Sequence, residues 1–425
     1  MSDILIENVR LIDPASGLDA HGSLLVKSGR IADLGQGIGR PDGVKVLDGK
    51  GAILCPGLVD SRVELGEPGG EYRETIATAA LAASAGGITT VAAMPDSKPA
   101  IDDPALVQLL RSRGAETGRI DIMPYGAATR GCQGKELAEY GLLSEAGAVA
   151  FTDGAKAIGS SRLMRLALSY ASTFGARIIQ HPEDPELASG GAATQGELAT
   201  RLGLPAIPAA AEAIIVARDV RLAEMTGGSV HFAHISTAEA LDIIRRAKDR
   251  GINATCDTAP PYFDLNETAI GDYRTYAKLS PPLRAEADRL AVVAGLADGT
   301  IDAIASDHQP RDPDDKRLPF AQAASGGVGL ATLLGVTLAQ VHSGKLSLMR
   351  ALELLTSAPA RLLGADDAGR LAKGAAADLC LFDLERAWQG NVGNLPGKAQ
   401  NSPFDGRALE GRVVGTWKNG VRVYG

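Results

Sequence analysis

The sequence predicts an α/β protein, namely a (β/α)8 TIM barrel with a small β-sandwich domain formed by both termini. The middle of the chain repeats a unit in which a helical stretch is followed by glycine and then by an apolar strand. Such alternation builds a parallel sheet, and the number of units that fits points to a closed barrel. Both ends of the chain are instead rich in short strands. We therefore expect a barrel over 56–364 and a composite β domain from 1–55 and 365–425.

The two ends carry the patterns typical of strands and hairpins. Near the N-terminus, short apolar runs such as Ile4-Leu5-Ile6 are separated by Gly and Asp. Near the C-terminus, the alternating run 411–421 contains Asn419-Gly420, a strong hairpin signal. Because similar patterns flank a different middle, we expect the two ends to share one domain.

Four repeats of the middle unit are the clearest. In each, glycine just past the helix supplies a left-handed cap before the strand. The predicted helices and their strands are 72–85 with 88–94, 162–174 with 176–181, 209–226 with 229–234, and 289–297 with 301–307.

Composition favours an ordinary globular, cytoplasmic protein over a nucleic-acid or membrane protein. The chain of 425 residues has a net charge of -8 and only 4% aromatic residues, which argues against nucleic acid and anionic lipid as partners. No apolar run is long enough to cross a bilayer and no signal peptide is visible. The four cysteines are scattered without a Cys-x-x-Cys pair, so we expect reduced thiols and no thiolate metal site.

Polar residues that can coordinate a metal follow the apolar strands. They are Asp60, Asp96, Asp153, His181, His234, Asp257 and Asp307. Barrel active sites form where the strand C-termini converge, so these side chains predict a site, working or vestigial. Each Asp alone could instead cap the following helix, and the two His could be hydrogen-bonded core residues. His21, His231 and His342 are interpreted as surface or packing residues.

The stretch 56–69 is the centre of this pattern. Alternate residues of a strand face the same side, so Asp60, Arg62 and Glu64 should point one way. Charged side chains on a buried face are costly unless they pair or serve a site.

At these residues the chain resembles the dihydroorotases, cyclic amidohydrolases of the amidohydrolase superfamily. The likeness covers nearly the whole chain and includes Pro56-Gly57-Leu58-Val59-Asp60, Glu67-Pro68-Gly69, Met94-Pro95, Phe151-Thr152-Asp153, His181-Pro182-Glu183-Asp184, His234-Ile235-Ser236-Thr237, Pro281-Pro282-Leu283-Arg284, 298–308 and Ala376-Ala377-Asp378-Leu379. The resemblance implies a barrel plus β-sandwich, a role in pyrimidine biosynthesis, hydrolysis or closure of the dihydroorotate ring, and one or two zinc ions.

Part of the family site is retained. By resemblance, Asp153 matches the carboxylate that bridges two metals, and His181 and His234 match ligands of the second metal. Asp307 matches the catalytic carboxylate, either working or vestigial. Three such ligands could still hold one zinc ion at most. Lys156 and Asp184 lie close in sequence, and we interpret Lys156 as a solvated loop or helix residue.

Many other family positions are substituted. The His-x-His of the first strand is replaced by Arg62 and Glu64, and the arginine that grips the substrate carboxylate by Gly66. Further substrate or metal positions hold other residues, namely Asp96, Ser280, Arg311, Pro260 and Pro261.

These substitutions argue against zinc hydrolysis. Arg62 has no lone pair to give a metal and cannot be deprotonated, so it places a fixed positive charge where a cation should sit. We expect Arg62 to replace the metal by pairing with Asp153 and Asp307, and Glu64 to pair with Arg62. Gly66 removes a carboxylate clamp, and Asp96 adds a negative charge where an anionic substrate would dock.

Three functions follow from this interpretation. The first is a catalytically inactive dihydroorotase-like protein, a pseudoenzyme that is a structural partner of aspartate carbamoyltransferase and itself a homo-oligomer. The second is an active cyclic amidohydrolase, a dihydroorotase or an allantoinase- or hydantoinase-like enzyme with a single zinc at Asp153, His181 and His234 and with Asp307 as base. The third is a sensor that binds a pathway intermediate without turnover.

Overall fold

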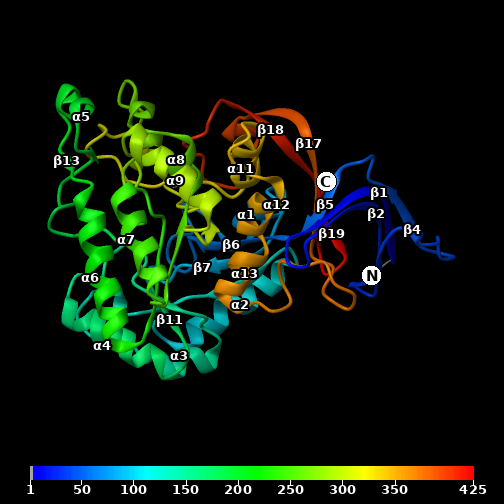
Figure 1. The fold of residues 1–425 in the computed structure, drawn as a ribbon, viewed down its shortest axis with the longest axis horizontal. Helices are drawn as coiled ribbons and strands as arrows, with labels where there is room; N and C mark the ends of the chain where they lie inside the picture. Colours follow the sequence, from blue (N-terminus) through cyan, green and yellow to red (C-terminus); the bar gives the residue numbers. More distant parts are fainter. Residues whose placement is uncertain (1–2) are drawn as a thin grey trace.

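The computed structural model describes residues 3–425, which form a barrel part and a sheet part side by side (Figure 1). The barrel strands are β6 (Leu58–Val63), β7 (Ile88–Ala93), β8 (Asp121–Pro124), β9 (Gly126–Ala127), β10 (Phe151–Thr152), β11 (Arg177–Gln180), β14 (Ser229–Phe232), β15 (Ala254–Thr258) and β16 (Ala303–Ile304). Neighbouring strands in this series pair in parallel within β6–β8 and within β9–β16.

The barrel closes on itself. Val63 of β6 bridges in parallel to His308, which follows β16. On the other side, β8 continues into β9, and Tyr125 between them donates its backbone N–H to Ala93 of β7. With β8 and β9 as parts of one strand, the series makes the (β/α)8 barrel that the sequence predicts.

Helices cover the outside of the barrel (Figure 1). The longer ones are α1 (Ile76–Ala85), α2 (Pro104–Thr117), α3 (Tyr140–Ala146), α4 (Ser161–Ser172), α6 (Ala210–Thr226), α7 (Ala238–Asp249), α9 (Glu286–Asp298), α11 (Leu333–His342), α12 (Leu348–Leu355) and α13 (Ser357–Leu363). Short elements in the loops are α5 (Glu197–Leu202), α8 (Pro260–Asp264), α10 (Pro313–Arg317), the strand pair β12 (Ala193–Thr194) and β13 (Ala206–Ile207), and 3-10 turns at Arg130–Cys132, Glu267–Ile270, Thr275–Ala277 and Val392–Asn394. No helix within residues 3–425 combines the length and apolar character that crossing a bilayer requires.

The first predicted barrel helix begins later than expected. The sequence predicts it from residue 72, but α1 starts at Ile76 because Thr75 acts as its N-cap and accepts from the Thr78 backbone N–H. The preceding residues form turns held by the buried Glu74 carboxylate, which accepts from the Lys398 backbone N–H at 3.1 Å. Glu74 thereby ties the loop after β17 to the barrel.

Strands from both ends of the chain form one connected sheet. They are β1 (Ile4–Asp13), β2 (Leu18–Lys27), β3 (Arg30–Gly35), β4 (Lys45–Asp48), β5 (Ile53–Pro56), β17 (Leu379–Gly390), β18 (Arg407–Lys418) and β19 (Val421–Tyr424). Their order is β19-β18-β17-β5-β1-β2-β3, and β4 pairs with β1. β5 therefore joins the N-terminal strands to the C-terminal ones. The predicted hairpin at Asn419-Gly420 links β18 and β19.

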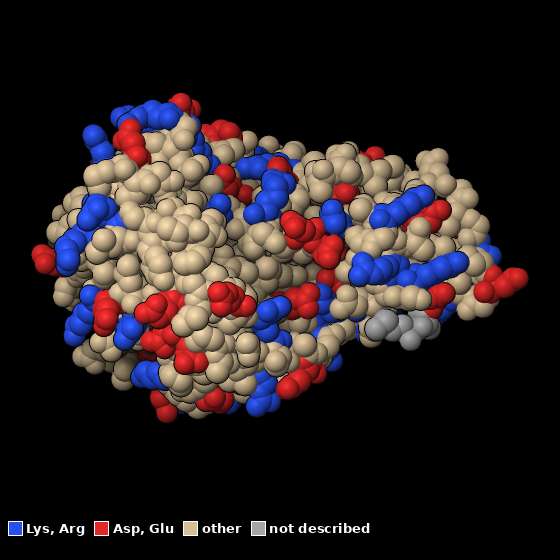
Figure 2. Space-filling view, turned by 90° about the horizontal axis from the view of Figure 1, so that it is seen from below, with Lys and Arg blue, Asp and Glu red and all other residues tan. Residues whose placement is uncertain are grey.

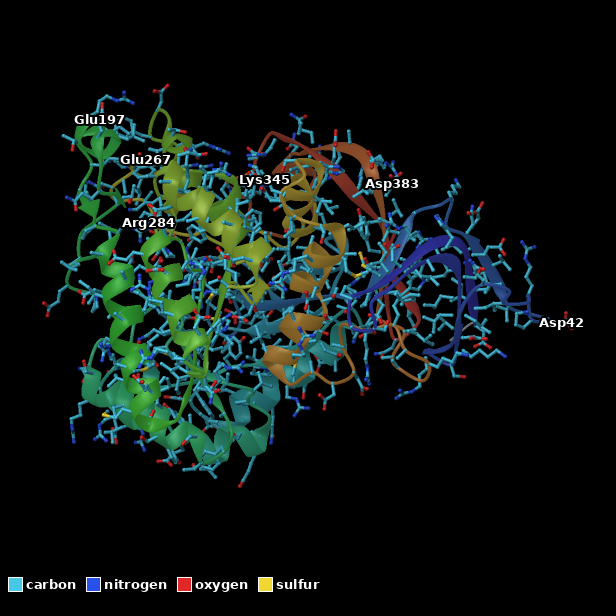
Figure 3. All side chains as sticks on the ribbon, viewed as in Figure 1. Asp42, Glu197, Glu267, Arg284, Lys345 and Asp383 are labelled. Carbon is cyan, nitrogen blue, oxygen red and sulfur yellow. The ribbon has the colours of Figure 1, made fainter. Side chains whose placement is uncertain are left out.

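This sheet curls around a core of its own. Arg30 at the start of β3 bridges to Ala376, just before β17, although β3 and β17 are far apart in the sheet order. Ile6, Ile31 and Trp417 belong to one buried apolar cluster. The two halves of the sheet thus face each other, as the layers of the predicted sandwich do. Asp42 and Asp383 mark this part in Figure 3, and Arg284 marks the barrel.

Acidic and basic side chains are intermingled over the face of the molecule seen in Figure 2. Several form exposed ion pairs, for example Arg10 with Asp19 and Arg245 with Asp298. Pairs of this kind contribute little to stability.

Candidate functional site

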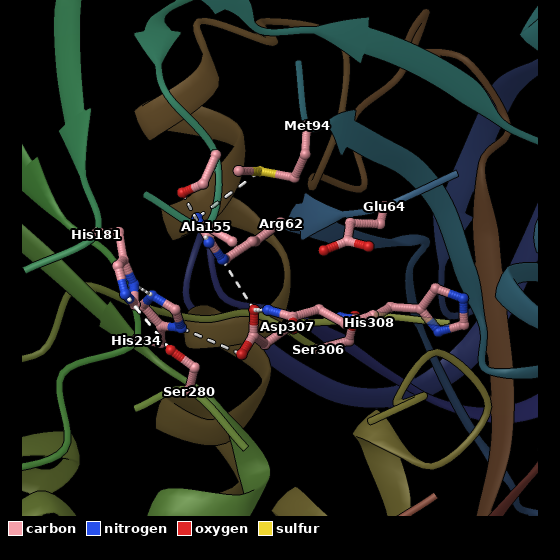
Figure 4. A network of polar contacts seen from close by, with 12 residues as sticks. Arg62, Glu64, Met94, Ala155, His181, His234, Ser280, Ser306, Asp307 and His308 are labelled. Carbon is pink, nitrogen blue, oxygen red and sulfur yellow. Dashed lines mark hydrogen bonds and ion pairs between the residues drawn. The ribbon is translucent and has the colours of Figure 1, made fainter. Parts of the chain in front are cut away.

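A buried ion pair lies where the barrel strands end. Arg62 of β6 donates from Nε to Oδ1 of Asp307 at 2.8 Å, and the two side chains are 4% and 9% exposed. The guanidinium also donates from Nη2 to the Gly154 carbonyl at 3.2 Å and packs against the Met94 sulfur (Figure 4). Arg62 therefore supplies a permanent positive charge inside the barrel mouth.

Asp307 is fully engaged by its neighbours. Besides Arg62, its Oδ1 accepts from Gln309 Nε2 at 3.0 Å, and its Oδ2 accepts from His234 Nδ1 at 3.1 Å. Burial would raise the pKa of this carboxyl, but His234 and Arg62 outweigh burial and hold the pKa well below its usual range. Asp307 is thus a stable carboxylate and a weak base.

The two predicted histidines bind each other. Nδ1 of His181 lies 2.8 Å from Nε2 of His234 (Figure 4). Burial and the Arg62 charge lower the pKa of His234 to about 4 although Asp307 opposes them, so His234 is neutral near pH 7. Its single proton lies on Nδ1, toward Asp307, and its Nε2 accepts from His181.

The chain of contacts continues beyond the histidine pair. Nε2 of His181 lies 3.6 Å from Oε2 of Glu183 and 3.5 Å from Oγ of Ser280. Burial would raise the pKa of Glu183, but the hydrogen bond and charge of His181 lower it. The result is a continuous line of polar contacts from Arg62 through Asp307, His234 and His181 to Glu183.

Asp153 stands apart from this line. Its carboxylate accepts from the backbone N–H and the hydroxyl of Thr129, at 2.8 and 2.6 Å. Burial raises the pKa of Asp153, and the Thr129 bonds oppose that rise. The prediction that Arg62 pairs with both carboxylates is therefore confirmed for Asp307 and wrong for Asp153, because Thr129 satisfies Asp153 instead.

These residues do not fit a zinc ion as they lie. Both ring nitrogens of His234 and Nδ1 of His181 are occupied by hydrogen bonds, and both oxygens of Asp153 bind Thr129. Within residues 3–425, no three His, Cys, Asp or Glu side chains gather so that they could hold a metal. The structure therefore does not bring Asp153, His181 and His234 together as ligands.

Glu64 does not pair with Arg62, contrary to the prediction. β6 ends at Val63, so Glu64 lies beyond the barrel strand and reaches the loop after β16. There it binds Arg311 through two contacts of 2.6 and 3.2 Å. Two substituted positions, Glu64 and Arg311, thus neutralise each other in a bidentate ion pair.

The backbone conformation at position 66 explains why the residue there is glycine. Its φ is +75°, and a Cβ at this position would overlap the carbonyl oxygen of Glu74. No residue with a side chain fits there without rearrangement of the loop. In its present conformation, the loop thus excludes an arginine at position 66.

The remaining substituted positions have local structural partners. Asp96 accepts from the Ala155 backbone N–H at 3.1 Å, and Ser280 contacts Glu183 at 3.3 Å. Pro260 and Pro261 begin the short helix α8. Lys156 is exposed, as expected, and Asp184 caps a turn by accepting from Glu186 N–H.

Sequence reasoning missed Glu183, Gln309 and Thr129 as members of the site. Glu183 and Gln309 each lie two residues after a predicted site residue, a spacing that places their side chains on the same side in extended backbone. Thr129 gives no such signal, because it follows β9, which is far from Asp153 in sequence.

Comparison with known proteins agrees with this fold. A sequence model of the family described as Dihydro-orotase-like matches residues 51–240. A protein named dihydroorotase from Citrifermentans bemidjiense is 45% identical over 422 residues, covering 99% of both chains. One of the same name from Anaeromyxobacter sp. strain K is 44% identical over 427 residues, covering 100% of this chain and 98% of its own.

The chain belongs to the dihydroorotase family. Among solved structures, the L-hydantoinase (dihydropyrimidinase) of Arthrobacter aurescens superposes with a TM-score of 0.89 at 24% identity, covering 100% of this chain and 96% of its own. The D-hydantoinase (dihydropyrimidinase) of a Thermus species gives 0.84 at 24% identity, covering 99% and 95%. At these identities the likeness shows the fold, which is the barrel with its β domain. Within the dihydroorotase fold, the site described above contains a buried arginine–carboxylate pair.

Asp60 is a second buried carboxyl next to this pair, and its pKa lies near neutrality. Asp60 of β6 is fully buried, and its Oδ1 accepts from the backbone N–H of Ser306 and of Arg62, at 3.0 and 3.2 Å. Burial raises the pKa of Asp60 to about 7, and the hydrogen bonds only partly oppose this. Its other oxygen has no partner among the described residues.

Asp60 should therefore make stability depend on pH. Between about pH 4 and 7 the folded chain keeps a proton on Asp60 that the unfolded chain has released, so the contribution of Asp60 to the free energy of unfolding should fall as pH rises, by up to about 4 kcal/mol, while the lowered pKa of His234 acts in the opposite direction in both chains. Asp60→Asn keeps the acceptor oxygen and removes only the Asp60 contribution, so the difference in unfolding free energy between wild type and variant should fall as pH rises. Urea unfolding of both chains from pH 4 to 8 measures it, and parallel profiles would contradict the assignment.

Proposed function

We propose that the chain is a non-catalytic member of the dihydroorotase family that acts as a structural partner of aspartate carbamoyltransferase. One observation carries the first half of the proposal, namely the buried Arg62 guanidinium bound to Asp307. A cation held by the protein itself occupies the position that the family resemblance assigns to a metal ligand. The barrel then keeps its shape without the group that activates water.

The state of Asp307 supports the absence of turnover. A general base needs a free lone pair and a pKa close to the working pH. Asp307 is bound by Arg62, His234 and Gln309, and its pKa is held well below the usual range of a carboxyl. Proton abstraction by this carboxylate is correspondingly weak.

The residues that would meet a substrate support the same interpretation. The Gly66 loop offers no side chain for a carboxylate, and Asp96 presents a negative charge near the Arg62 end of the site. An anionic ring such as dihydroorotate would meet repulsion where the family resemblance implies attraction. A charge-assisted hydrogen bond contributes about 1.5–3 kcal/mol, so its loss alone weakens binding about tenfold or more.

The choice of aspartate carbamoyltransferase as partner rests on the family resemblance. Paralogues that have lost catalytic residues are kept in this family as structural partners of that enzyme. The preserved barrel, β domain and ion pairs are what such a role requires, because an interface depends on the fold and not on the site. We expect the chain to form homo-oligomers within such an assembly.

A second candidate is an active cyclic amidohydrolase with a single zinc ion. The full-length likeness to proteins named dihydroorotase favours it. It would require His181 and His234 to give up their mutual hydrogen bond and Asp153 to leave Thr129. The arrangement of the described residues therefore favours the first candidate.

The test measures both the turnover of dihydroorotate and the assembly of the chain with aspartate carbamoyltransferase. The purified chain, with and without added zinc, should convert dihydroorotate at less than about one ten-thousandth of the rate of an active dihydroorotase measured in parallel. The aspartate carbamoyltransferase of the same organism should co-elute with the chain in size-exclusion chromatography. Turnover at an ordinary enzymatic rate would refute the inactive assignment, and separate elution would refute the partner.

A further inference from the structure

Two of the four cysteines face each other across neighbouring strands. Cys55 lies in β5 and Cys380 in β17, and the antiparallel register makes them direct partners. Both side chains are fully buried in the apolar cluster that joins the sheet to the barrel. They come from opposite ends of the sequence, so their meeting is a product of the fold and not of local spacing.

The backbone hydrogen bonds fix the distance between the two strands at this point. Gly57 donates its N–H to the Asp378 carbonyl at 2.8 Å, which makes Gly57 and Asp378 a hydrogen-bonded pair. Since such pairs recur every second residue, Cys55 and Cys380 form one as well, and Pro56, which has no N–H, occupies the non-bonded position between them. The Cα atoms of hydrogen-bonded pairs are about 5.5 Å apart, which lies within the range of disulfides.

The side chains are directed so that they can meet. Direct partners in a sheet project to the same face. The Cys380 sulfur packs against Gly87 at the start of β7, where a Cβ on that glycine would overlap it. Burial raises the pKa of the Cys55 thiol well above its usual value, and the contact with the Cys380 thiol adds to the rise. The two thiols thus share one apolar space.

The other two cysteines have different surroundings. The Cys132 thiol lies 3.9 Å from the Pro95 carbonyl, and the Cys256 thiol lies 3.3 Å from the Thr300 carbonyl. Their partners are backbone oxygens, and within residues 3–425 all four cysteines are free thiols. Cys132 and Cys256 therefore serve as internal references for the pair in the sheet.

We propose that Cys55 and Cys380 form a redox site, which closes to a disulfide when the protein meets a small hydroperoxide. One thiolate attacks hydrogen peroxide to give a sulfenic acid and, with a proton, one water. The second thiol then attacks the sulfenic sulfur and a second water leaves, so two thiols and one peroxide give one disulfide and two waters. A hydroperoxide suits the site because it is small enough to reach buried thiols, whose raised pKa makes the reaction slow.

The disulfide would join β5 to β17 covalently. These strands connect the N-terminal and C-terminal halves of the sheet, next to the barrel. The bond closes a very long loop, which strongly reduces the conformational entropy of the unfolded chain. Oxidation should thus stabilise the composite sheet without reaching the Arg62–Asp307 pair.

Peptide mapping of the whole protein tests the proposal directly. After prolonged exposure to hydrogen peroxide, remaining thiols are alkylated under denaturing conditions and the digest is analysed without reduction. We expect a Cys55–Cys380 peptide lighter than the separate peptides by two hydrogen atoms in most chains. We also expect a rise in melting temperature of roughly 5 °C that a reductant reverses.

The variant Cys132→Ser/Cys256→Ser keeps only the proposed pair and should behave in the same way. Cys380→Ser should give neither the linked peptide nor the reversible rise. The wild-type digest needs no substituted chain, so it decides the case even if a variant folds poorly. The proposal is overturned if the linked peptide is absent, or if peroxide leaves Cys55 and Cys380 alkylatable or oxidised singly.

Discussion

Replacing Arg62 with methionine is expected to lower the free energy of unfolding by about 3–5 kcal/mol, the usual cost of leaving one charge of a buried ion pair unpaired. The substitution keeps most of the apolar contact with Met94 but removes the charge beside Asp307. Without Arg62, the pKa of Asp307 should rise from its depressed position. Urea unfolding at pH 7 measures the loss, which should shrink at lower pH as Asp307 takes up a proton.

A double-mutant cycle separates this pair from general damage to the core. Asp307→Asn combined with Arg62→Met should cost clearly less than the two single changes added together. Arg113→Met breaks an exposed pair with Glu116, in which the side chains are 55% and 64% exposed, and should cost at most about 1 kcal/mol. Additive effects in the cycle would show that Arg62 does not act through Asp307.

Replacing Gly66 with arginine, the residue the family resemblance implies there, is expected to damage the fold and to restore no substrate binding. The left-handed φ and the overlap with the Glu74 carbonyl both oppose a side chain. Strain at such a site costs about 1–3 kcal/mol, and the steric overlap adds to it, so we expect a loss above about 3 kcal/mol. Urea unfolding gives the loss, and calorimetric titration with dihydroorotate should show no binding.

Gly175 provides a matched control. Its φ is +63°, and a Cβ there would meet no atom within 4 Å. Gly175→Ala should therefore cost only the backbone strain, about 1–2 kcal/mol, whereas Gly66→Ala should cost more. Equal losses at the two positions would mean that the Glu74 carbonyl moves aside. An arginine at position 66 could then fit and bind a substrate carboxylate.

The barrel could be predicted from the sequence because its signals are local. Helical stretches followed by glycine, as before β7, β14 and β16, mark each unit without knowledge of distant residues. The hairpin at Asn419-Gly420 is likewise encoded in two residues. The start of α1 was less predictable, since Thr75 as the cap competes with earlier polar residues that look equally helical.

The pairing of charges in the site could be predicted only in part. The sequence predicts the pairing of Arg62 with Asp307, because a carboxylate buried at the barrel mouth needs a cation. Glu64 pairs with Arg311, which is distant in sequence, and Thr129 satisfies Asp153 from another strand. Such choices depend on where β6 ends and on loop paths, which hydrophobic periodicity does not encode. The meeting of Cys55 and Cys380 also needs the register of β5 on β17.

The placement of β5 between β1 and β17 has a consequence for the synthesis of the protein itself on the ribosome. The ribosome releases β1 to β5 first, and the edge of β5 that binds β17 stays open until almost the whole chain has emerged. Unpaired strand edges invite association with other chains. Truncation before residue 379 leaves this edge permanently unpaired and should therefore yield aggregates rather than a shortened soluble protein.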